Sequence, residues 1–545
     1  MRLINTTTHE LHDFPYHPMP EYAILSHTWG DDEVIFQEMT HSSRFSKAGY
    51  TKIRGTCQLA IEHGLQYAWI DTCCIDKSSS AELTESINSM FQWYKNAAVC
   101  YVYLQDLPVH VGFEEGLPKC RWLTRGWTLQ ELLAPENIEF FDEGWKRRGT
   151  KFDYVNNIAD CSGIPVAVLR GERDMARCSV ARRMAWASKR QTSRIEDQAY
   201  SLLGIFDVNM PMIYGEGPKA FRRLQEEIVK RNNDLIILAW DNLRERKARA
   251  MGLFAESSAS FASTSDVDAS NNSAASFTVT NKGLVISGIP LLSVAYPAAI
   301  YGECNAELYC IYLGVCGPRS AAVGLILRRI GPGYFYRDGS TPMAGFRSDL
   351  NDQLLNLTDN IDFCIIVDLP EEFDLPDSFR SLSLHVPQHR LFSLRDQCPD
   401  SLWDITDRAF LNVDRYNYCK YPVVMAMIFS ASVLDVYVDI VVLCERNWET
   451  SLPLCRVFNL ADHRRATKFI FQEKHGERHL HWDELELQAP ELCGLGNEVV
   501  VVVHDISHRV TAHFEEEIVP KISTSRPVFT LKLHVSPLES AHART

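Results

Sequence analysis

The sequence lacks several features that would assign it to a special class of protein. Its first residues contain no apolar core before a small-residue cleavage site, so we expect no signal peptide. Its most apolar run, residues 422–443, is interrupted by Asp435 and Asp439, and the alternating valines fit two strands better than a membrane span. The sixteen cysteines lack the close regular spacing of a disulfide framework, which favours a reduced, cytoplasmic protein.

An excess of positive charge is also absent. The chain has 55 lysines and arginines against 70 aspartates and glutamates, a net charge of -15. Because such a chain repels phosphate backbones as a whole, we expect no nucleic-acid partner. What the chain has is length and apolar content: 545 residues, 46% of them hydrophobic, can fold into about two to four domains.

Strand and helix patterns alternate through residues 1–165. A helix is predicted at residues 53–63, ended by Gly64, and a second follows Ser79 and Glu82, which have capping-box spacing. Apolar strands are predicted at residues 22–25, 67–70, 99–104 and 138–141. This alternation predicts an α/β fold with a mainly parallel sheet and helices on both faces. Ligands of such sheets bind beyond the carboxyl ends of the strands.

The rest of the chain divides into three parts. Residues 166–250 have helical patterns, clearest at 193–206 and 218–232, and form a helical extension. Residues 251–276 are rich in Ser, Ala, Asn and Asp, which predicts a flexible linker. Residues 277–545 contain strand patterns separated by turn-rich segments, so we expect a β-rich C-terminal domain, a sandwich or irregular barrel of unassigned role.

Three dense polar and aromatic segments follow the predicted strands, at residues 22–30, 67–76 and 126–135. In the third, Trp127 lies one helical turn before Glu131, near the start of a short predicted helix. Thr128 and Glu131 also have capping-box spacing, and by that interpretation Glu131 only closes the start of its helix. The two roles are compatible, since a helix start places a carboxylate in a positive local field.

Other chemistries have weaker support. Asp71 and Asp76 flank Cys73 and Cys74, but no CxxC pair or histidine cluster accompanies them, so we expect no metal site. A nucleophilic Cys73 or Cys74 would need His27 as its base, and a buried, inert cysteine is the commoner outcome.

A serine hydrolase is not indicated either. Ser26 and His27 are adjacent at a strand end and therefore point in different directions, and no G-x-S-x-G elbow is present. We interpret His27 as a ligand-contacting or loop-structuring residue and Trp29 as either a stacking platform or a packing residue. Residues 215–217 lack the strand and third glycine of a dinucleotide fingerprint, which leaves them as a turn.

The three segments resemble the heterokaryon incompatibility (HET) domain of fungal proteins. The resemblance covers roughly the first 240 residues and rests on the blocks at residues 22–30, 69–77, 86–94, 125–135 and 196–217. HET domains in turn resemble TIR domains in strand order and motif placement. This implies a TIR-like, flavodoxin-like sheet whose first three strands are the predicted ones at residues 22–25, 67–70 and 99–104.

TIR enzymes that destroy NAD carry their glutamate in a W-x-x-x-E pattern, which Trp127 and Glu131 match. The resemblance implies that Glu131 is the catalytic carboxylate and that NAD is the substrate, with no separate cofactor. A carboxylate there would stabilise the oxocarbenium charge that develops when nicotinamide leaves the ribose. The implied pocket residues are Ser26, His27, Trp29, Asp71, Cys73 and Trp127, with backbone N–H groups or Arg44, Lys77 or Arg125 on the phosphates.

The resemblance therefore implies an effector of incompatibility or immune-type cell death that cleaves the nicotinamide–ribose bond. It also implies self-association through the HET domain, with a C-terminal domain that senses a protein partner or restrains the enzyme. Two alternatives stay open. One is a non-enzymatic signalling module in which Glu131 is only a cap, and the other is a cysteine-dependent hydrolase.

Overall fold

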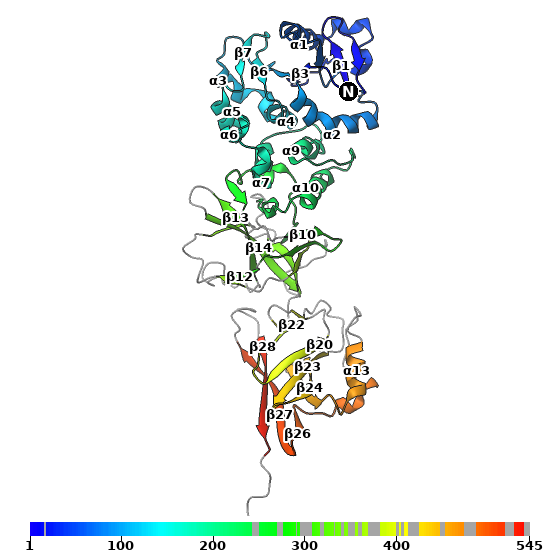
Figure 1. Cartoon of the computed structure of the whole chain (residues 1–545), viewed down its shortest axis with the longest axis vertical. Coiled ribbons are helices and arrows are strands. Elements are labelled where there is room, and N and C mark those ends of the chain that lie inside the picture. The colour runs from blue at the N-terminus through cyan, green and yellow to red at the C-terminus, as the bar shows by residue number, and fades with distance from the viewer. Residues whose placement is uncertain are drawn as a thin grey trace, which may run out of the picture.

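The computed structural model describes residues 1–15, 18–241, 250–269 and 276–289. Beyond these it describes residues 291–294, 308–316, 321–331, 333–338, 343–346, 355–357, 362–368, 382–398, 403–404, 408–412, 424–446, 453–472, 485, 487–517 and 528–538. The parts follow one another along the longest axis in chain order (Figure 1). None of the helices in these ranges is both long enough and apolar enough to cross a bilayer.

A seven-stranded sheet forms the N-terminal part, with strand order β2-β1-β4-β3-β5-β6-β7. Its four central strands are parallel: β4 (Tyr67–Trp69), β3 (Tyr22–His27), β5 (Val99–Tyr103) and β6 (Ile138–Phe141). In chain order these are the second, first, third and fourth, as in flavodoxin-like sheets. The edges are antiparallel, formed by β1 (Arg2–Asn5), β2 (Leu11–Asp13) and β7 (Arg147–Thr150). The predicted mixed α/β region with a parallel sheet is confirmed.

The sheet is covered by helices on both faces. Helix α1 (Tyr50–Glu62) connects β3 to β4, and α2 (Ser80–Asn96) connects β4 to β5. Because the two right-handed crossovers run in opposite directions, the two helices lie on opposite faces. Gly64 ends the first helix with a φ of 74°, a conformation that glycine adopts without strain. Strands β3 and β5 are adjacent, so the chain leaves them in opposite directions and opens a crevice at their carboxyl ends.

Residues 113–231 contain several helices, most of them short, besides the strands β6 and β7. The predicted helix at 218–232 is confirmed as α10 (Lys219–Arg231). The predicted helix at 193–206 is instead two short helices, α8 (Asp197–Tyr200) and α9 (Leu203–Phe206), because residues 191–196 form an irregular segment against the first domain. The others are α3 (Phe113–Gly116), α4 (Thr128–Leu133), α5 (Val155–Ser162), α6 (Val166–Leu169) and α7 (Val180–Ala187).

The expected linker differs from a flexible connection where the structure describes it. Leu253 and Phe261 are fully buried, and Ser179 Oγ donates a hydrogen bond to the Val267 carbonyl at 2.6 Å. This stretch contains β8 (Ala250–Met251), a 3-10 turn at Ser258–Phe261 and β9 (Val267–Ala269). Its small polar residues are interspersed with apolar anchors that pack against the helical extension.

An eleven-stranded sheet follows, and its core is continuous with that of the N-terminal part. One apolar cluster runs from Leu3 to Val367. The buried Arg337 guanidinium reinforces the connection by donating to the carbonyls of Leu238, at 2.8 Å, and Trp240. The remaining strands are β10 (Ser276–Val279), β11 (Leu284–Ser287), β12 (Leu292–Val294), β13 (Leu308–Cys316), β14 (Ala321–Gly331), β15 (Tyr334–Asp338), β16 (Met343–Phe346), β17 (Leu355–Leu357) and β18 (Phe363–Ile365).

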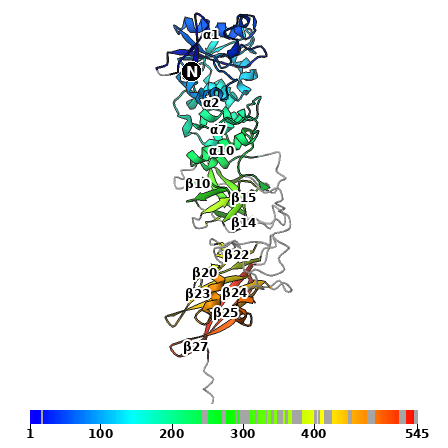
Figure 2. The ribbon, with the colours of Figure 1, turned by 90° about the vertical axis from the view of Figure 1, so that its right-hand side faces the viewer.

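The C-terminal part is a β-sandwich, whose strands Figure 2 shows from a second side, and it has an apolar core of its own. One sheet has the order β21-β22-β19-β28-β27-β26 and the other β20-β23-β24-β25. The sequence predicts strands rather than a membrane span at residues 422–443. This range contains β23 and the larger part of β24, which pair as antiparallel strands. The chain reverses between them at Leu434 and Asp435. The elements are β19 (Leu382–His385), β20 (Phe392–Cys398), β21 (Trp403–Asp404), β22 (Ala409–Asn412), β23 (Met425–Val433), β24 (Val436–Arg446), β25 (Pro453–Asn459), α13 (Arg464–Gln472), β26 (Glu498–Val503), β27 (Ile506–Glu517) and β28 (Val528–Pro537). The predicted β-rich C-terminal region is confirmed.

Candidate functional site

A cavity of about 520 Å³ lies where the parallel strands end. Its lining comes from the end of β3, the loops after β3, β4 and β5, the helices α2 and α4, and the helical extension. This is the crevice in which flavodoxin-like sheets bind their ligands. The lining residues are His27, Trp29, Asp71, Ile75, Lys77, Leu83, Ile87, Met90, Arg121, Thr124, Arg125, Trp127, Glu131, Gln191, Thr192, Ser193, Arg194, Asp197 and Tyr214.

Glu131 is a buried carboxyl group in this cavity. Ser26 Oγ, at the end of β3, donates a hydrogen bond to it, and Trp122 Nε1 donates to Ser26 Oγ at 2.7 Å. Burial raises the pKa of Glu131 to about 8, against the opposing effects of the Ser26 hydrogen bond and of nearby arginines. Ser26 therefore lies behind the carboxyl group, outside the lining.

The capping box that the spacing of Thr128 and Glu131 suggested does not form. Thr128 Oγ1 donates to the carbonyls of Trp122 and, at 2.9 Å, Arg125 instead of capping the helix. Trp127 occupies the N-cap position of α4 without a side-chain cap. The Glu131 carboxyl group is thus directed to Ser26 and the cavity rather than to the backbone of its own helix.

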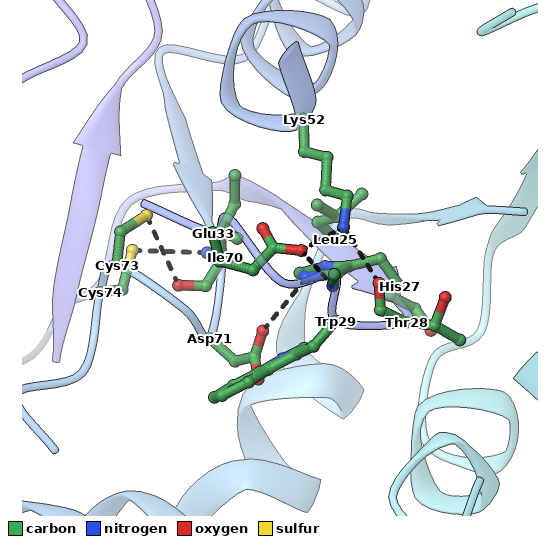
Figure 3. A network of polar contacts seen from close by, with 12 residues as sticks. Leu25, His27, Thr28, Trp29, Glu33, Lys52, Ile70, Asp71, Cys73 and Cys74 are labelled. Carbon is green, nitrogen blue, oxygen red and sulfur yellow. Dashed lines mark hydrogen bonds and ion pairs between the residues drawn. The ribbon is translucent and has the colours of Figure 1, made fainter. Parts of the chain in front are cut away.

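Three residues after β3 and β4 form a connected group. Trp29 Nε1 donates to Asp71 Oδ2 at 2.9 Å, and His27 Nε2 lies 3.9 Å from Asp71 Oδ1 (Figure 3). Neither ring nitrogen of His27 has a hydrogen-bond partner within the described residues. Burial lowers the pKa of His27 to about 4, so the imidazole is neutral at pH 7.

A buried ion pair supports the loop that carries these residues. Lys52 extends from α1, donates to the Thr28 carbonyl at 3.0 Å and pairs with Glu33 (Figure 3). Glu33 Oε1 in turn accepts from the backbone N–H of Gly30 at 2.8 Å. The pair therefore fixes both sides of Trp29.

Cys73 and Cys74 do not line the cavity. Both are buried, and their sulfur atoms contact the Ile70 backbone, at 3.9 Å for Cys73 and 3.4 Å for Cys74 (Figure 3). The adjacent Cys74 thiol and burial raise the pKa of Cys73 well above its usual range, which disfavours the thiolate that a nucleophile needs. Within the described ranges, no group of His, Cys, Asp and Glu side chains has the arrangement of a metal site.

Four cations surround the cavity without a carboxylate partner in the described part of the chain: Lys77, Arg121, Arg125 and Arg194. Lys77 Nζ lies 3.4 Å above the Trp29 ring, and the Arg194 guanidinium 4.4 Å above the Tyr214 ring. Burial lowers the pKa of Lys77. Arg44, also predicted as a possible contact of the phosphates, lies over the Phe45 ring and is not part of the cavity lining.

Residues of the helical extension were missed as site residues. Asp197 and Tyr214 line the cavity and bond to each other, with Tyr214 Oη 3.0 Å from Asp197 Oδ1. Burial raises the pKa of Asp197. The block at residues 196–217 resembles known proteins, and that resemblance could have marked Asp197 and Tyr214 as site residues. The spacing of residues within the block does not indicate that this segment folds back onto the sheet.

Comparisons with known proteins agree on the N-terminal part. Residues 22–115 match the family model "Heterokaryon incompatibility protein (HET)", and residues 219–283 match a domain of unknown function, DUF8212. The "Vegetative incompatibility protein HET-E-1" of Podospora anserina is 48% identical over 247 residues, which cover 44% of this chain and 18% of that protein. The chain thus spans less than a fifth of the length of that relative. No solved structure matches. The N-terminal part of this chain contains a HET domain.

Proposed function

We propose that this protein acts in heterokaryon incompatibility and that its HET domain is a TIR-like NAD glycohydrolase. Glu131 is the catalytic carboxylate, and the cleavage of NAD, which releases nicotinamide in the cytoplasm, causes cell death. Copies of the domain associate, and the C-terminal part restrains the enzyme or receives a protein partner. The observation that carries the proposal is a glutamate buried at a sheet-end cavity, without a bond to its own helix.

The charges around the cavity support a dinucleotide as substrate. NAD combines a cationic pyridinium ring with an anionic pyrophosphate, and the cavity offers carboxyl groups in its interior and, around it, cations that have no carboxylate partner among the described residues. Lys77, Arg125 and Arg194 are free to bind phosphate oxygens, although the chain as a whole carries a net charge of -15. Trp29 offers an exposed aromatic face for a flat ring.

The chemistry requires one acid residue. The bond between ribose C1′ and the pyridinium nitrogen breaks, and its electron pair leaves with nicotinamide, which becomes neutral. Positive charge develops at C1′ and the ring oxygen, where the Glu131 carboxylate stabilises it. Water adds to C1′ and loses a proton, which gives ADP-ribose. Because nicotinamide leaves as a neutral molecule, no second carboxyl group has to protonate it.

The state of Glu131 before the substrate binds fits this sequence of events. With a pKa of about 8, its carboxyl group is mostly protonated at pH 7. A pyridinium cation placed beside it favours the ionised form, since an opposite charge within a few ångströms lowers the pKa of a carboxyl group. The substrate itself therefore promotes the charge that its cleavage needs.

The test is nicotinamide release from NAD by the purified full chain, measured by chromatography. In Glu131→Gln, which keeps the side-chain volume and an acceptor for Ser26, we expect a loss of roughly 100-fold to 1,000-fold. Glu139→Gln is the matched control, because Glu139 pairs with Arg147 at 2.9 Å on β6, outside the cavity.

Equal release by wild type and Glu131→Gln would contradict the proposal. Absence of release from folded, self-associated wild type would do so too, and it would favour the interaction module, in which the cavity binds a ligand or partner without cleaving it.

A further inference from the structure

The helical extension closes the cavity that the sheet leaves open. Glu131 and the segment that precedes it, residues 122–128, lie outside the range that matches the HET family model, and so do all lining residues of the extension. Residues 191–194 and Asp197 of the extension face the loops of the sheet across the cavity. The segment that carries Glu131 and the part of the extension that faces it are therefore about 60 residues apart in the chain.

Backbone pairing attaches the two segments to each other. The N–H of Gly126 donates to the Gln191 carbonyl at 2.8 Å, and the N–H of Gln191 donates to the Thr124 carbonyl at 2.6 Å. Gly126 allows this approach, because a Cβ atom there would lie 2.5 Å from Thr192 Cγ2. Side chains larger than hydrogen at position 126 would push the extension away from α4.

Arg190 reinforces the attachment from a buried position. One of its guanidinium nitrogens, Nη1, donates to the Arg125 carbonyl at 2.8 Å and to Thr128 Oγ1 at 2.9 Å. Both acceptors are neutral, and within the described ranges no carboxylate forms an ion pair with it. A buried cation of this kind is costly unless a negative charge lies near. The acid that acts on it is Glu131, which follows Thr128 on the same short helix.

We propose that Arg190 is a positioning residue of this site: from behind the lining it fixes the first turn of α4, the helix that carries Glu131, and it supplies a positive charge to that side of the carboxyl group. The catalytic consequence rests on the function proposed above, whereas the coupling between the two side chains does not. The helical extension is then part of the catalytic unit, and the sheet alone does not form the complete site.

Several other groups also affect the charge of Glu131, and the effect of Arg190 on the pH profile of nicotinamide release has to be distinguished from theirs. From the surrounding elements these are Asp71, Arg125, Tyr94 and Cys100, with Ser26 as the hydrogen-bond donor and His27, Lys77 and Asp197 sharing the cavity. Arg190 differs from Arg125 and Lys77 in that it lies behind the lining, where no substrate reaches it. Its removal leaves the substrate contacts in place.

The test compares Arg190→Met with Arg190→Lys in the full chain. Without the cation the pKa of Glu131 rises further, so the acid limb of the pH profile of nicotinamide release moves to higher pH. Each unit of this shift lowers release at pH 7 about tenfold. Arg190→Lys keeps the charge and restores most of the profile. Gly126→Ala should separate the same two segments without changing a charge, and it should lower release with a smaller shift of the profile.

Arg183→Met is the matched control. Arg183 is a buried arginine on α7 that donates to the Ile205 carbonyl at 3.0 Å, outside the cavity. Its loss should reduce stability without moving the pH profile. An unshifted profile in Arg190→Met, or equal shifts in Arg190→Met and Arg183→Met, would overturn the proposal.

A second measurement separates this proposal from the proposed function. Thermal unfolding is recorded from pH 6 to pH 9 for the wild type, Arg190→Met, Glu131→Gln and the double variant, none of which needs NAD. Coupling predicts that Arg190→Met changes the pH dependence when Glu131 is present and not when it is replaced. If release is absent but this pattern holds, only the enzymatic function fails. If release depends on Glu131 and the pattern is absent, only the role of Arg190 fails.

Discussion

Buried charged side chains are distributed unevenly between residues 1–367 and the C-terminal sandwich. The first region buries Glu33, Lys52, Glu131, Asp142, Lys151, Arg183, Arg190, Glu196 and Arg337. Among the described residues of the sandwich, no Asp, Glu, Lys or Arg is buried, and the polar residues inside it are Ser430, Thr467, His508 and Thr530. Both regions have large apolar cores, so size alone does not explain the difference.

The buried charged side chains of the first region are of two kinds: some are paired with an opposite charge, and others are not. Asp142 has Arg148 at 3.0 Å, and Glu33 has Lys52, so these charges are matched. Within the described residues Glu131 and Arg190 have only neutral hydrogen-bond partners, and so do Lys151, Arg183 and Arg337. Burying a charge without a direct partner is unfavourable. Of these residues only Glu131 lines the cavity, and a buried carboxyl group with a shifted pKa at a cavity is a candidate for a functional role. The sandwich, with an apolar interior, has the composition of a module built for stability.

The largest effect on stability is expected from the matched pair. Lys52→Met leaves Glu33 buried without its cation and removes the support of the Trp29 loop, so the free energy of unfolding should fall by about 3–5 kcal/mol. Denaturant unfolding measures it. Combining the change with Glu33→Gln should recover most of the loss, and a single-variant loss below about 1 kcal/mol would show that the pair is not effectively buried.

A substitution that creates a cavity in the apolar core of the sandwich provides the contrasting case. Ile440 is fully buried on β24, and Ile440→Ala should cost about 2–5 kcal/mol of stability. Nicotinamide release by the folded variant should not fall below that of the wild type, because the site lies in the other region. Reduced release below the unfolding temperature would show that the two regions are coupled and that the contrast between them is incomplete.

Glu131 should make the N-terminal region less stable as the pH rises. Its pKa is about 8 in the folded protein and about 4.5 in the unfolded chain, so between these values the folded state binds more protons. The stabilising contribution is complete below pH 4.5 and is lost as the pH rises through 8. From pH 6 to pH 8 the loss is about 2 kcal/mol. In Glu131→Gln this part of the slope should disappear, and an unchanged slope would assign it to other groups.

Local patterns predicted the elements that position the site, but not the contacts that complete it. The apolar runs at residues 22–25 and 138–141 gave the parallel strands, because strand formation follows local hydrophobic pattern. Composition predicts a linker at residues 251–276, because serines there outnumber apolar anchors such as Phe261, which only its burial identifies.

Tertiary contacts also overrode local spacing at α4. Thr128 has capping-box spacing, yet its hydroxyl bonds to the Arg125 carbonyl and accepts from Arg190, 62 residues further along the chain. No pattern within a short window contains that partner. The same reason hid Asp197 and Tyr214, which reach the cavity only because the extension folds back onto the sheet.

The smallest effect is expected from Lys77, a cation that we expect to contribute to substrate binding rather than to the stability of the fold. Lys77 lies over the Trp29 ring without a carboxylate partner in the described part of the chain. Lys77→Met should raise the KM for NAD about tenfold, or about 1.4 kcal/mol, with little change in kcat, because a phosphate contact is present both before and during cleavage. Stability should stay the same or increase, since a partly buried and unpaired charge is removed. Lys95→Met, an exposed lysine near the end of α2, is the control. A drop in stability with an unchanged KM would instead make Lys77 a structural residue, like Lys52.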